Sequence, residues 1–303
     1  MDRLQAMRVF VAVAEEESFA RAAIRLGMSP PAVTRSVSAL EGYLGVKLLT
    51  RTTRYVRTTE AGLGYLESTR RILAEADEAD EAVVGVHAAP RGQLNVTAPL
   101  MFGSMYVMPG VVDYLTRHPD VSVSALFFDR VVNLIEEGID VGVRIGELPD
   151  STLRAIPVGH VRRVLCASPD YLASHVKVKT PHDLANHTVI QSAAAPSSVD
   201  WRFGNDNKKA TAQNTVKLKP RLVTSNNEAA IQATLQGFGI TRVMSYQVAA
   251  HIAAGRLKSI LTADEPPPLP IHVLHREGRQ ASGKVRSFVD LLVERLRADK
   301  ALH

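Results

Sequence analysis

The chain has 303 residues, enough to bury a sizeable core and to form two or three domains. Hydrophobic residues make up 46% of it and charged residues 22%, which is typical of a globular protein in water. No stretch approaches the roughly 18 unbroken apolar residues of a membrane span, and the N-terminal segment lacks the layout of a signal peptide. The single cysteine, Cys166, cannot form an internal disulfide, which fits a reducing compartment. We therefore expect a cytoplasmic protein without membrane contact.

Positive charge is distributed unevenly along the chain, whose net charge is +5. Residues 1–58 hold nine Lys and Arg against five Asp and Glu, whereas residues 59–88 hold two against seven. The basic excess of the first segment lies late in it, from Lys47 to Arg57. Such an excess indicates a polyanionic partner, although ordinary variation of a solvated surface explains it equally well.

Two helices separated by a tight turn are predicted between Ser18 and Leu44. The first follows an N-cap at Ser18 and ends at Gly27, and the second begins at Pro30 after an N-cap at Ser29. The apolar stripe of the second helix consists of Val33, Val37, Leu40 and Leu44. Its other side is small or polar and carries Pro31, Thr34, Arg35 and Ser38. This arrangement is typical of a helix-turn-helix, whose second helix enters the major groove of DNA.

Two short extended runs follow around the stretch TRTTR, and they predict a β-hairpin wing. The wing is rich in arginine and threonine, which suit contacts with phosphate groups. The candidate phosphate contacts are Arg51, Thr52, Arg54 and Arg57.

The stretch from Ser18 to Gly62 closely resembles the N-terminal winged helix-turn-helix of LysR-type transcriptional regulators. Matches occur at fixed spacing at Ala22, Ala23, Leu26, Ser29, Ala32, Val33, Arg35, Leu40, Glu41, Leu44, Gly45, Leu48, Arg51, Thr59, Glu60, Ala61 and Gly62. The resemblance extends more loosely over the whole chain. It implies a transcriptional regulator that binds double-stranded DNA. The candidate DNA contacts on the second helix are Ser29, Pro31, Thr34, Arg35 and Ser38, and we expect Thr34, Arg35 and Ser38 to lie toward the bases. Many relatives carry glutamine where this chain has Pro30, and proline cannot pair with adenine as glutamine does.

The next segment, residues 59–88, contains no proline and predicts one helix of about 40 Å. An approximate heptad stripe runs along it, formed by Leu66, Thr69, Ile72, Leu73, Ala76 and Val83. This stripe either packs on the helix's own domain or pairs with a second subunit. We favour pairing, as the resemblance implies, and therefore expect a homo-oligomer, a dimer or a tetramer.

After the breaker APRGQ at residues 89–93, strands alternate with helices. Strands are predicted at 93–99, 121–128, 140–146, 162–169, 187–193, 221–225, 239–244 and 266–277. Helices are predicted at 101–118, 130–138, 226–237, from about 245 to about 255, and 282–297. The alternation indicates an α/β domain with a largely parallel sheet. By resemblance, residues 89–303 form a periplasmic-binding-protein-like effector domain of two α/β halves: half I (91–161 and 269–303) and half II (162–268). Residues 1–58 are then the all-α winged helix-turn-helix domain, and residues 59–88 the linker helix.

Ligands of such domains bind at the carboxyl ends of strands, here between the halves. The stretches TAPLMFG and VTSNNEAA each end a strand and begin a helix, so their amides suit an anion, with Ser225 or Asn226 as a cap. The candidate effector contacts are Pro99, Leu100, Met101, Phe102, Phe128, Arg144, Thr224, Asn226 and Phe238.

Some of these candidates have two interpretations. Arg144 either binds an effector carboxylate or pairs with Glu147 or Asp140, and each aromatic suits either the core or the pocket. Relatives often have serine or threonine where this chain has Met101, which indicates a more apolar pocket. We expect a small, partly apolar effector that carries a carboxylate.

Motifs of common enzymes are missing from the sequence: it has no G-x-S-x-G elbow, no P-loop and no H-E-x-x-H. His182 and His187 lack the further ligands of a metal site, and Cys166 lies in an apolar strand. We therefore expect no catalytic residues, no cofactor and no metal. Two alternatives to an effector-controlled regulator remain: a helix-turn-helix fused to a small-molecule enzyme, and a cytoplasmic solute-binding protein.

Overall fold

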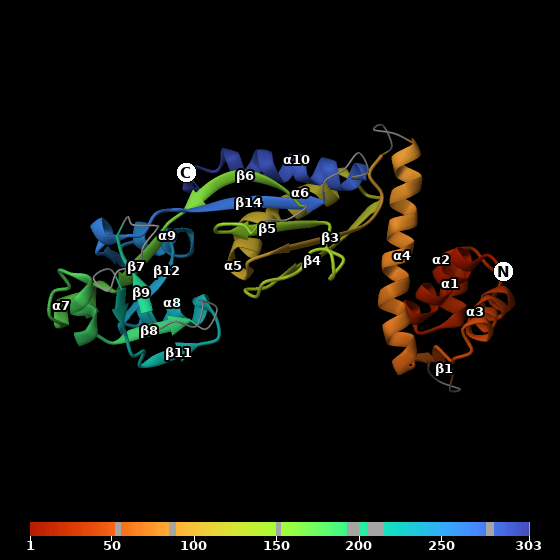
Figure 1. Ribbon diagram of the computed structural model, residues 1–303, viewed down its shortest axis with the longest axis horizontal. Coiled ribbons are helices and arrows are strands. Elements are labelled where there is room, and N and C mark those ends of the chain that lie inside the picture. Colours follow the sequence, from red (N-terminus) through yellow and green to blue (C-terminus); the bar gives the residue numbers. More distant parts are fainter. Residues whose placement is uncertain are drawn as a thin grey trace. The chain divides into compact units, whose positions relative to one another are not determined.

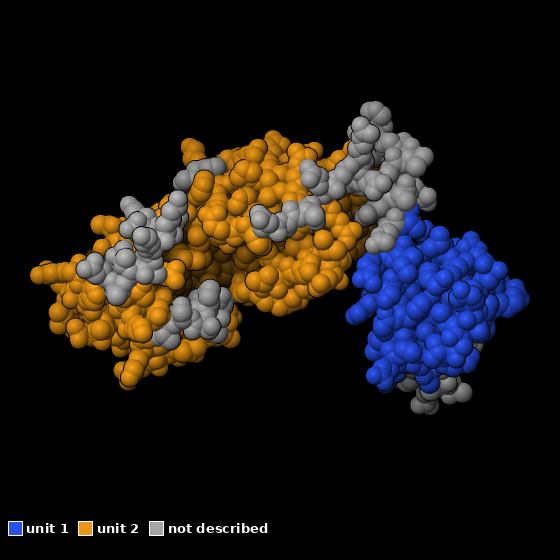
Figure 2. Space-filling view, in the orientation of Figure 1, with its two compact units in different colours: residues 1–88 blue, residues 89–303 orange. Residues whose placement is uncertain are grey.

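The structure is a computed structural model that describes residues 1–51, 56–84, 89–149, 153–192, 200–204, 215–276 and 282–302. The chain divides into two compact units, residues 1–88 and residues 89–303 (Figure 2). The division falls where the breaker at residues 89–93 begins. Among the described helices, none combines the length and the apolar character that a membrane crossing requires.

The first unit is a small helical domain with a two-stranded hairpin (Figure 1). Its elements in chain order are α1 (Arg3–Glu16), α2 (Phe19–Leu26), α3 (Pro30–Leu44), β1 (Leu49–Arg51), β2 (Val56–Thr58) and α4 (Glu60–Val84). The predicted caps are confirmed: the Ser18 hydroxyl accepts from the Arg21 amide at 3.3 Å, and the Ser29 hydroxyl from the Ala32 amide at 3.4 Å. The predicted hairpin is also confirmed, as an antiparallel pair.

Helix α1, which the sequence patterns did not predict, supplies much of the core of this unit. Its Val9, Phe10 and Val13 pack with Val33, Val37 and Leu40 of α3. The predicted stripe of the second helix is therefore confirmed as its buried side.

Part of the predicted stripe of α4 packs within its own unit. Leu66 packs against the core, and Thr69 and Leu73 are buried. Arg70 donates two hydrogen bonds to the Glu15 carboxylate of α1, at 3.1 and 2.7 Å. These contacts correspond to the interpretation that we did not favour, at least for the first half of the helix. The predicted end of the helix, residues 85–88, lies outside the described residues.

The second unit contains two five-stranded sheets, one in each half (Figure 1). The order in half I is β4-β3-β5-β14-β6, with β3 (Gly92–Ala98), β4 (Val121–Phe127), β5 (Val141–Ile145), β6 (Leu153–Val161) and β14 (Leu269–Arg276). The order in half II is β11-β8-β12-β7-β13, with β7 (Arg163–Ala167), β8 (Val189–Ser192), β11 (Leu222–Thr224), β12 (Ile240–Met244) and β13 (Lys258–Ile260).

Helices and a hairpin cover these sheets. In half I they are α5 (Leu100–Phe102), the π-helical η1 (Gly103–Val107), α6 (Met108–Arg117), α10 (Gly283–Ala298) and the 3₁₀ turn η5 (Lys300–Leu302). In half II they are α7 (Pro169–Ser174), the 3₁₀ helix η2 (Pro181–Asn186), α8 (Asn227–Leu235), α9 (Ser245–Ala253), the 3₁₀ turn η4 (Thr262–Asp264) and the hairpin of β9 (Asp200–Arg202) and β10 (Thr215–Lys217).

The prediction of a largely parallel sheet is only half right. In half I, β3 pairs in parallel with β4 and β5, whereas β14 pairs antiparallel with β5 and β6. In half II, β8 pairs in parallel with β11 and β12, whereas β7 pairs antiparallel with β12 and β13. The β14–β6 pair is antiparallel because the chain leaves half I along β6 and returns along β14, so these two strands run beside each other in opposite directions.

The predicted helix at residues 130–138 is wrong, because this segment forms turns. The Asn133 side chain accepts hydrogen bonds from the amides of Ile135 and Glu136 at 3.1 and 3.4 Å, which competes with helical bonding. Val132 and Leu134 are buried in a small cluster of their own. Strands β6, β9, β10 and β13 and helix α7 were not predicted.

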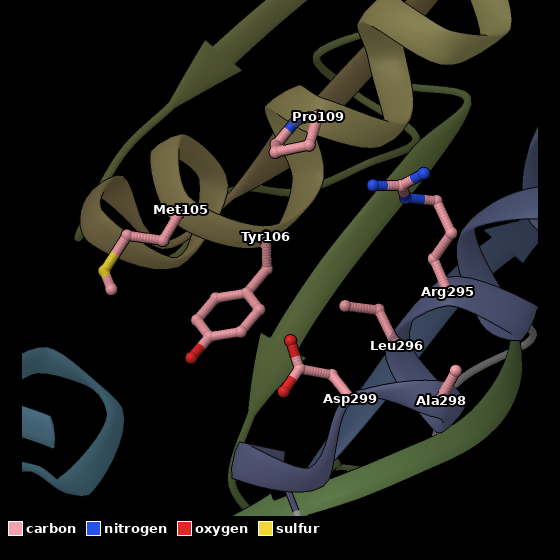
Figure 3. Close-up of a pocket in the computed structure, with 7 residues that line it drawn as sticks. All are labelled: Met105, Tyr106, Pro109, Arg295, Leu296, Ala298 and Asp299. Carbon is pink, nitrogen blue, oxygen red and sulfur yellow. The ribbon is translucent and has the colours of Figure 1, made fainter. Parts of the chain in front are cut away.

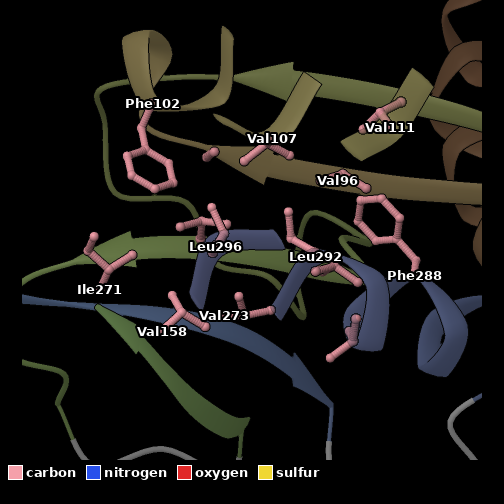
Figure 4. Close-up of a cluster of buried hydrophobic side chains, with 14 of the residues drawn as sticks. Val96, Phe102, Val107, Val111, Val158, Ile271, Val273, Phe288, Leu292 and Leu296 are labelled. Atoms are coloured by element: carbon pink, nitrogen blue, oxygen red, sulfur yellow. The ribbon is translucent and has the colours of Figure 1, made fainter. Parts of the chain in front are cut away.

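The largest core of the second unit lies between the sheet of half I and helices α6 and α10 (Figure 4). Phe102 is fully buried in it, with its ring centroid 4.9 Å from that of Tyr106 and 5.3 Å from that of Tyr246. Tyr246 belongs to half II, and Met101 packs against a core cluster of half II. The start of α5 therefore joins the two halves.

Candidate nucleic-acid interface and effector site

Exposed residues of α3 form one side of the first unit. Pro31, Arg35 and Ser38 are exposed and Thr34 is half-buried. Ser29 is exposed as well, although its hydroxyl caps the helix. The structure therefore presents together the α3 residues that the sequence singled out.

The arginines of the first unit fall into two groups. Arg25 and Arg70 bind the Glu15 carboxylate at 2.8 and 2.7 Å, so both have a partner within the unit. Arg35 and Arg57 are exposed, and neither side chain makes a hydrogen bond or an ion pair among the described residues. Free exposed guanidinium groups are available for an external anion such as DNA phosphate.

A buried carboxylate connects α3 to the wing. Glu41 accepts hydrogen bonds from the amides of Leu48 and Leu49 at 3.0 and 3.1 Å, and from Lys47 Nζ at 2.6 Å. Burial by itself raises the pKa of this carboxyl, but these hydrogen bonds outweigh it and hold the pKa below its ordinary value. Glu41 therefore positions β1 against the recognition helix, a role that the sequence patterns did not reveal.

The hairpin places Arg57 opposite Thr50. Arg51 ends β1 in the backbone register, and its partner there is Val56. Thr52 and Arg54 lie outside the described residues.

The first predicted effector stretch lies where the parallel strands of half I end. The amide of Leu100, after the cap residue Pro99, donates to the carboxylate of Asp129 at 3.1 Å. Phe128 lies at the same edge, since its amide donates to Ala98. Asp129, which we did not predict, occupies an amide that the sequence suggested for an external anion.

Arg144 does not form the salt bridge that was one of its two predicted interpretations. Its Nη2 donates to the carbonyl oxygen of Val132 at 2.7 Å, and it forms no ion pair with Glu147 or Asp140 in the described structure. Asp140 instead accepts from the amide of Asn95 at 2.7 Å. Burial lowers the pKa of Arg144 from its ordinary value.

The second predicted stretch lies where the parallel strands of half II end. Thr224 Oγ1 donates to the carbonyl of Asn226 at 2.9 Å, and Asn226 Oδ1 caps α8 by accepting from Ala229 at 2.9 Å. Both side chains are half-buried and support the local turn.

Two of the predicted effector contacts need correction. Phe238 precedes the first residue of β12, whereas Thr224 is the last residue of β11. Because both strands run parallel to β8, the two residues lie at opposite ends of the strands, and the ring of Phe238 contacts Arg221. Phe102 is a fully buried core residue and not an accessible wall of a pocket. The sequence does not show at which end of a strand such an apolar side chain lies, or whether it is buried in the core.

A hollow of about 360 Å³ lies elsewhere, between η1–α6 and the end of α10 (Figure 3). Its lining residues are Met105, Tyr106, Pro109, Arg295, Leu296, Ala298 and Asp299, none of which was predicted. Arg295 lies 3.4 Å from Asp113, and Asp299 accepts from the amide of Ala301 at 2.9 Å. Its charged groups therefore already have partners in the chain.

Comparison with known families agrees with this architecture. Residues 4–63 match the model described as bacterial regulatory helix-turn-helix protein, lysR family, and residues 87–297 match the LysR substrate binding domain. The chain belongs to the LysR family of transcriptional regulators. It is a DNA-binding transcriptional regulator whose binding is modulated by a small-molecule effector, as in that family.

Individual relatives of this LysR-type regulator match over nearly their full length. The transcriptional regulator PtxR of Pseudomonas aeruginosa is 34% identical over 293 residues, which cover 97% of this chain and 93% of PtxR. The structure of CrgA from Neisseria meningitidis is 33% identical, with a TM-score of 0.61 and coverage of 96% of this chain and 98% of CrgA. The full-length structure of the Vibrio cholerae virulence activator AphB is 25% identical, with a TM-score of 0.61 and coverage of 96% and 99%.

Proposed function

We propose that this regulator contacts DNA through the exposed side of α3 and through the wing. The observation that carries the proposal is a contrast among the described residues. The side chains of Arg35 and Arg57 have no partner there, whereas Arg25 and Arg70 pair within the unit. A free cation on each of two neighbouring elements suits a duplex, whose two phosphate backbones border the groove.

The two elements have different roles in this proposal. The α3 contacts are Ser29, Pro31, Thr34, Arg35 and Ser38, and of these Thr34, Arg35 and Ser38 face base edges. The wing residues contact phosphate, and they are Arg51, Thr52, Arg54 and Arg57. Phosphate contacts orient the protein without reading sequence, whereas Arg35 contributes to base recognition.

The test first selects, from a pool of DNA fragments, those that the purified full chain retains. Binding of the chain and its variants to these retained fragments is then measured as a function of salt concentration. Replacing Arg57 by Ala is expected to weaken binding to every sequence and to reduce the salt slope by about one. Replacing Arg35 by Ala is expected to reduce the preference for retained fragments over random DNA. Arg256→Gln, an exposed change in half II, serves as the control. Unchanged affinity and salt slope in an Arg51→Ala, Arg54→Ala, Arg57→Ala triple variant would overturn the docking.

We further propose that the effector binds where the strand ends of the two halves approach each other, near Leu100, Met101 and Thr224. Packing of Met101 against the half II cluster supports this position, because it brings the start of α5 to the second half. A ligand that bridges the halves changes the regulator through its different affinity for their two arrangements. A thermal-shift screen of aromatic and aliphatic acids, repeated on Thr224→Ala, tests the site. A hit whose affinity is unaffected by that substitution binds elsewhere.

Self-association through α4 is a further proposal for this chain, which we expect in the cytoplasm with its DNA. Leu66 and Leu73 are used within the unit, whereas Leu63 and Ile72 are 55% and 39% exposed and remain for a partner helix. Sedimentation of the full chain tests this proposal, and a monomer at micromolar concentration would contradict it.

A further inference from the structure

Two arginines of half II lie side by side on one face of its sheet. In the antiparallel pair of β7 and β12, Arg163 is opposite Met244 and Leu165 is opposite Arg242. Residues opposite each other share a face, and so do alternate residues of one strand, so both arginines lie on the same face as diagonal neighbours. Long side chains at such positions reach each other.

The guanidinium of Arg242 is held in place by its surroundings. It lies over the indole ring of Trp201, 5.0 Å from the ring centroid, and its Nη1 donates to the carbonyl oxygen of Arg202 at 3.2 Å. Trp201 is itself oriented, since its Nε1 donates to Gln191 Oε1 at 3.1 Å. The group is therefore fixed before any ligand arrives, which lowers the entropic cost of binding.

Neither arginine has a carboxylate partner in the described structure. Arg163 is half-buried, and its side chain makes no hydrogen bond or ion pair there. The adjacent Arg162 does pair, with Glu265 at 2.7 Å, so that carboxylate is already engaged. Burial lowers the pKa of both groups, that of Arg242 to about 9 with a contribution from Arg163. Burying two cations that repel each other costs free energy, and an anion bound between them offsets that cost.

We propose that Arg163 and Arg242 together bind an oxyanion, a carboxylate or phosphate group of a small molecule. Paired guanidinium forks match the geometry of either group and bind it through charge-assisted hydrogen bonds. The assignment rests on the proposed effector function and deepens it by naming the group that is recognised. It also adds cationic donors to the strand ends, where the Leu100 amide already donates to Asp129 and Arg144 Nη2 already donates to the carbonyl oxygen of Val132.

The position of the pair suits a link to the other half. Met244 lies directly opposite Arg163 and packs against the main core of half I. An anion that draws the two guanidinium groups together thus acts next to the boundary between the halves. Bidentate binding there stabilises one arrangement of that boundary over another.

The chain's only tryptophan makes the site directly observable, because Trp201 lies beneath Arg242. Inorganic phosphate and citrate are titrated separately into the full chain at constant ionic strength, and the emission of Trp201 is followed. At least one of the two is expected to change the emission saturably. Arg163→Met is expected to weaken that binding by about tenfold or more, and Arg256→Gln to leave it unchanged.

A second measurement separates a binding role from a structural one. Without added anion, Arg163→Met is expected to raise the melting temperature by roughly 2 °C, because it removes a desolvated and repelling charge. A structural arginine predicts the opposite sign. The proposal is overturned if neither anion changes the emission of Trp201 at tens of millimolar. It is also overturned if Arg163→Met binds the anion as tightly as the natural chain does, or if Arg163→Met and Arg256→Gln weaken anion binding equally.

DNA binding of the same variants keeps the two proposals apart. If the bound anion also alters DNA affinity or footprint length in the natural chain but not in Arg163→Met, the site acts in effector control. If the anion binds as expected and DNA binding never responds, the oxyanion site stands and its role in effector control is refuted.

Discussion

Replacing Glu41 by Ala is expected to weaken the first unit through the loss of a single buried carboxylate. Glu41 is 6% exposed and accepts hydrogen bonds from the amides of Leu48 and Leu49, which are buried as well. Alanine leaves both amides without an acceptor, and each unsatisfied buried donor costs about 1–3 kcal/mol. The ion pair with Lys47 adds little, because the Lys47 side chain is 76% exposed. We therefore expect a loss of about 2–6 kcal/mol for the two amides together.

The same carboxylate predicts a dependence on pH. Its pKa is lower in the folded protein than in the unfolded chain, so its ionised form stabilises the unit above the unfolded value of about 4.3. That contribution disappears as the pH falls through the lower, folded pKa. The difference in stability between the natural chain and Glu41→Ala is therefore expected to be largest at neutral pH and to shrink below about pH 4.

Urea unfolding of the full chain separates this effect from the second unit. Circular dichroism reports helix in both units, whereas Trp201, the only tryptophan, reports half II alone. Glu41→Ala is expected to shift the circular-dichroism transition of the first unit and to leave the tryptophan transition in place. Lys47→Ala is the matched control, with an expected loss below about 1 kcal/mol. An equal loss in both variants, or a loss below about 1 kcal/mol in Glu41→Ala, would refute the reasoning.

Three further experiments test how the buried residues pack. Burial raises the pKa of the Cys166 thiol to about 12, so we expect a thiol reagent at pH 8 to label it only after unfolding; rapid labelling of the folded protein would contradict this. A Cβ at Gly62 would overlap the Leu48 carbonyl oxygen, so Gly62→Ala is expected to cost about 1–3 kcal/mol in urea unfolding. Gly64→Ala on the same helix meets nothing within 4 Å and is expected to stabilise, which makes it the control. Phe102→Ala is expected to destabilise the second unit by about 3–5 kcal/mol by calorimetry, and a neutral result would show that its core position is wrong.

Local interactions explain why much of the chain was readable from its sequence. Ser18 and Ser29 cap helices by accepting from amides three residues away, and Gly27 adopts the left-handed conformation that ends α2. These features depend on neighbours within one turn of helix, so the residue types alone predict them. The apolar stripe of α3 was readable for the same reason, since its period matches the helical repeat. The two helices of the helix-turn-helix were therefore determined by the sequence itself.

Contacts between distant segments decided the rest. The turns at residues 130–138 replace a predicted helix because Asn133 bonds locally while its apolar neighbours pack against Leu274 of β14. Phe238 lies at the N-terminal end of β12, away from the strand ends that form the predicted cleft, because β12 runs parallel to β8. Arg163 and Arg242 are neighbours only because β7 and β12 pair in one antiparallel register. Strand register depends on which faces the whole domain buries, a balance of free energy over many residues that no short stretch of sequence contains.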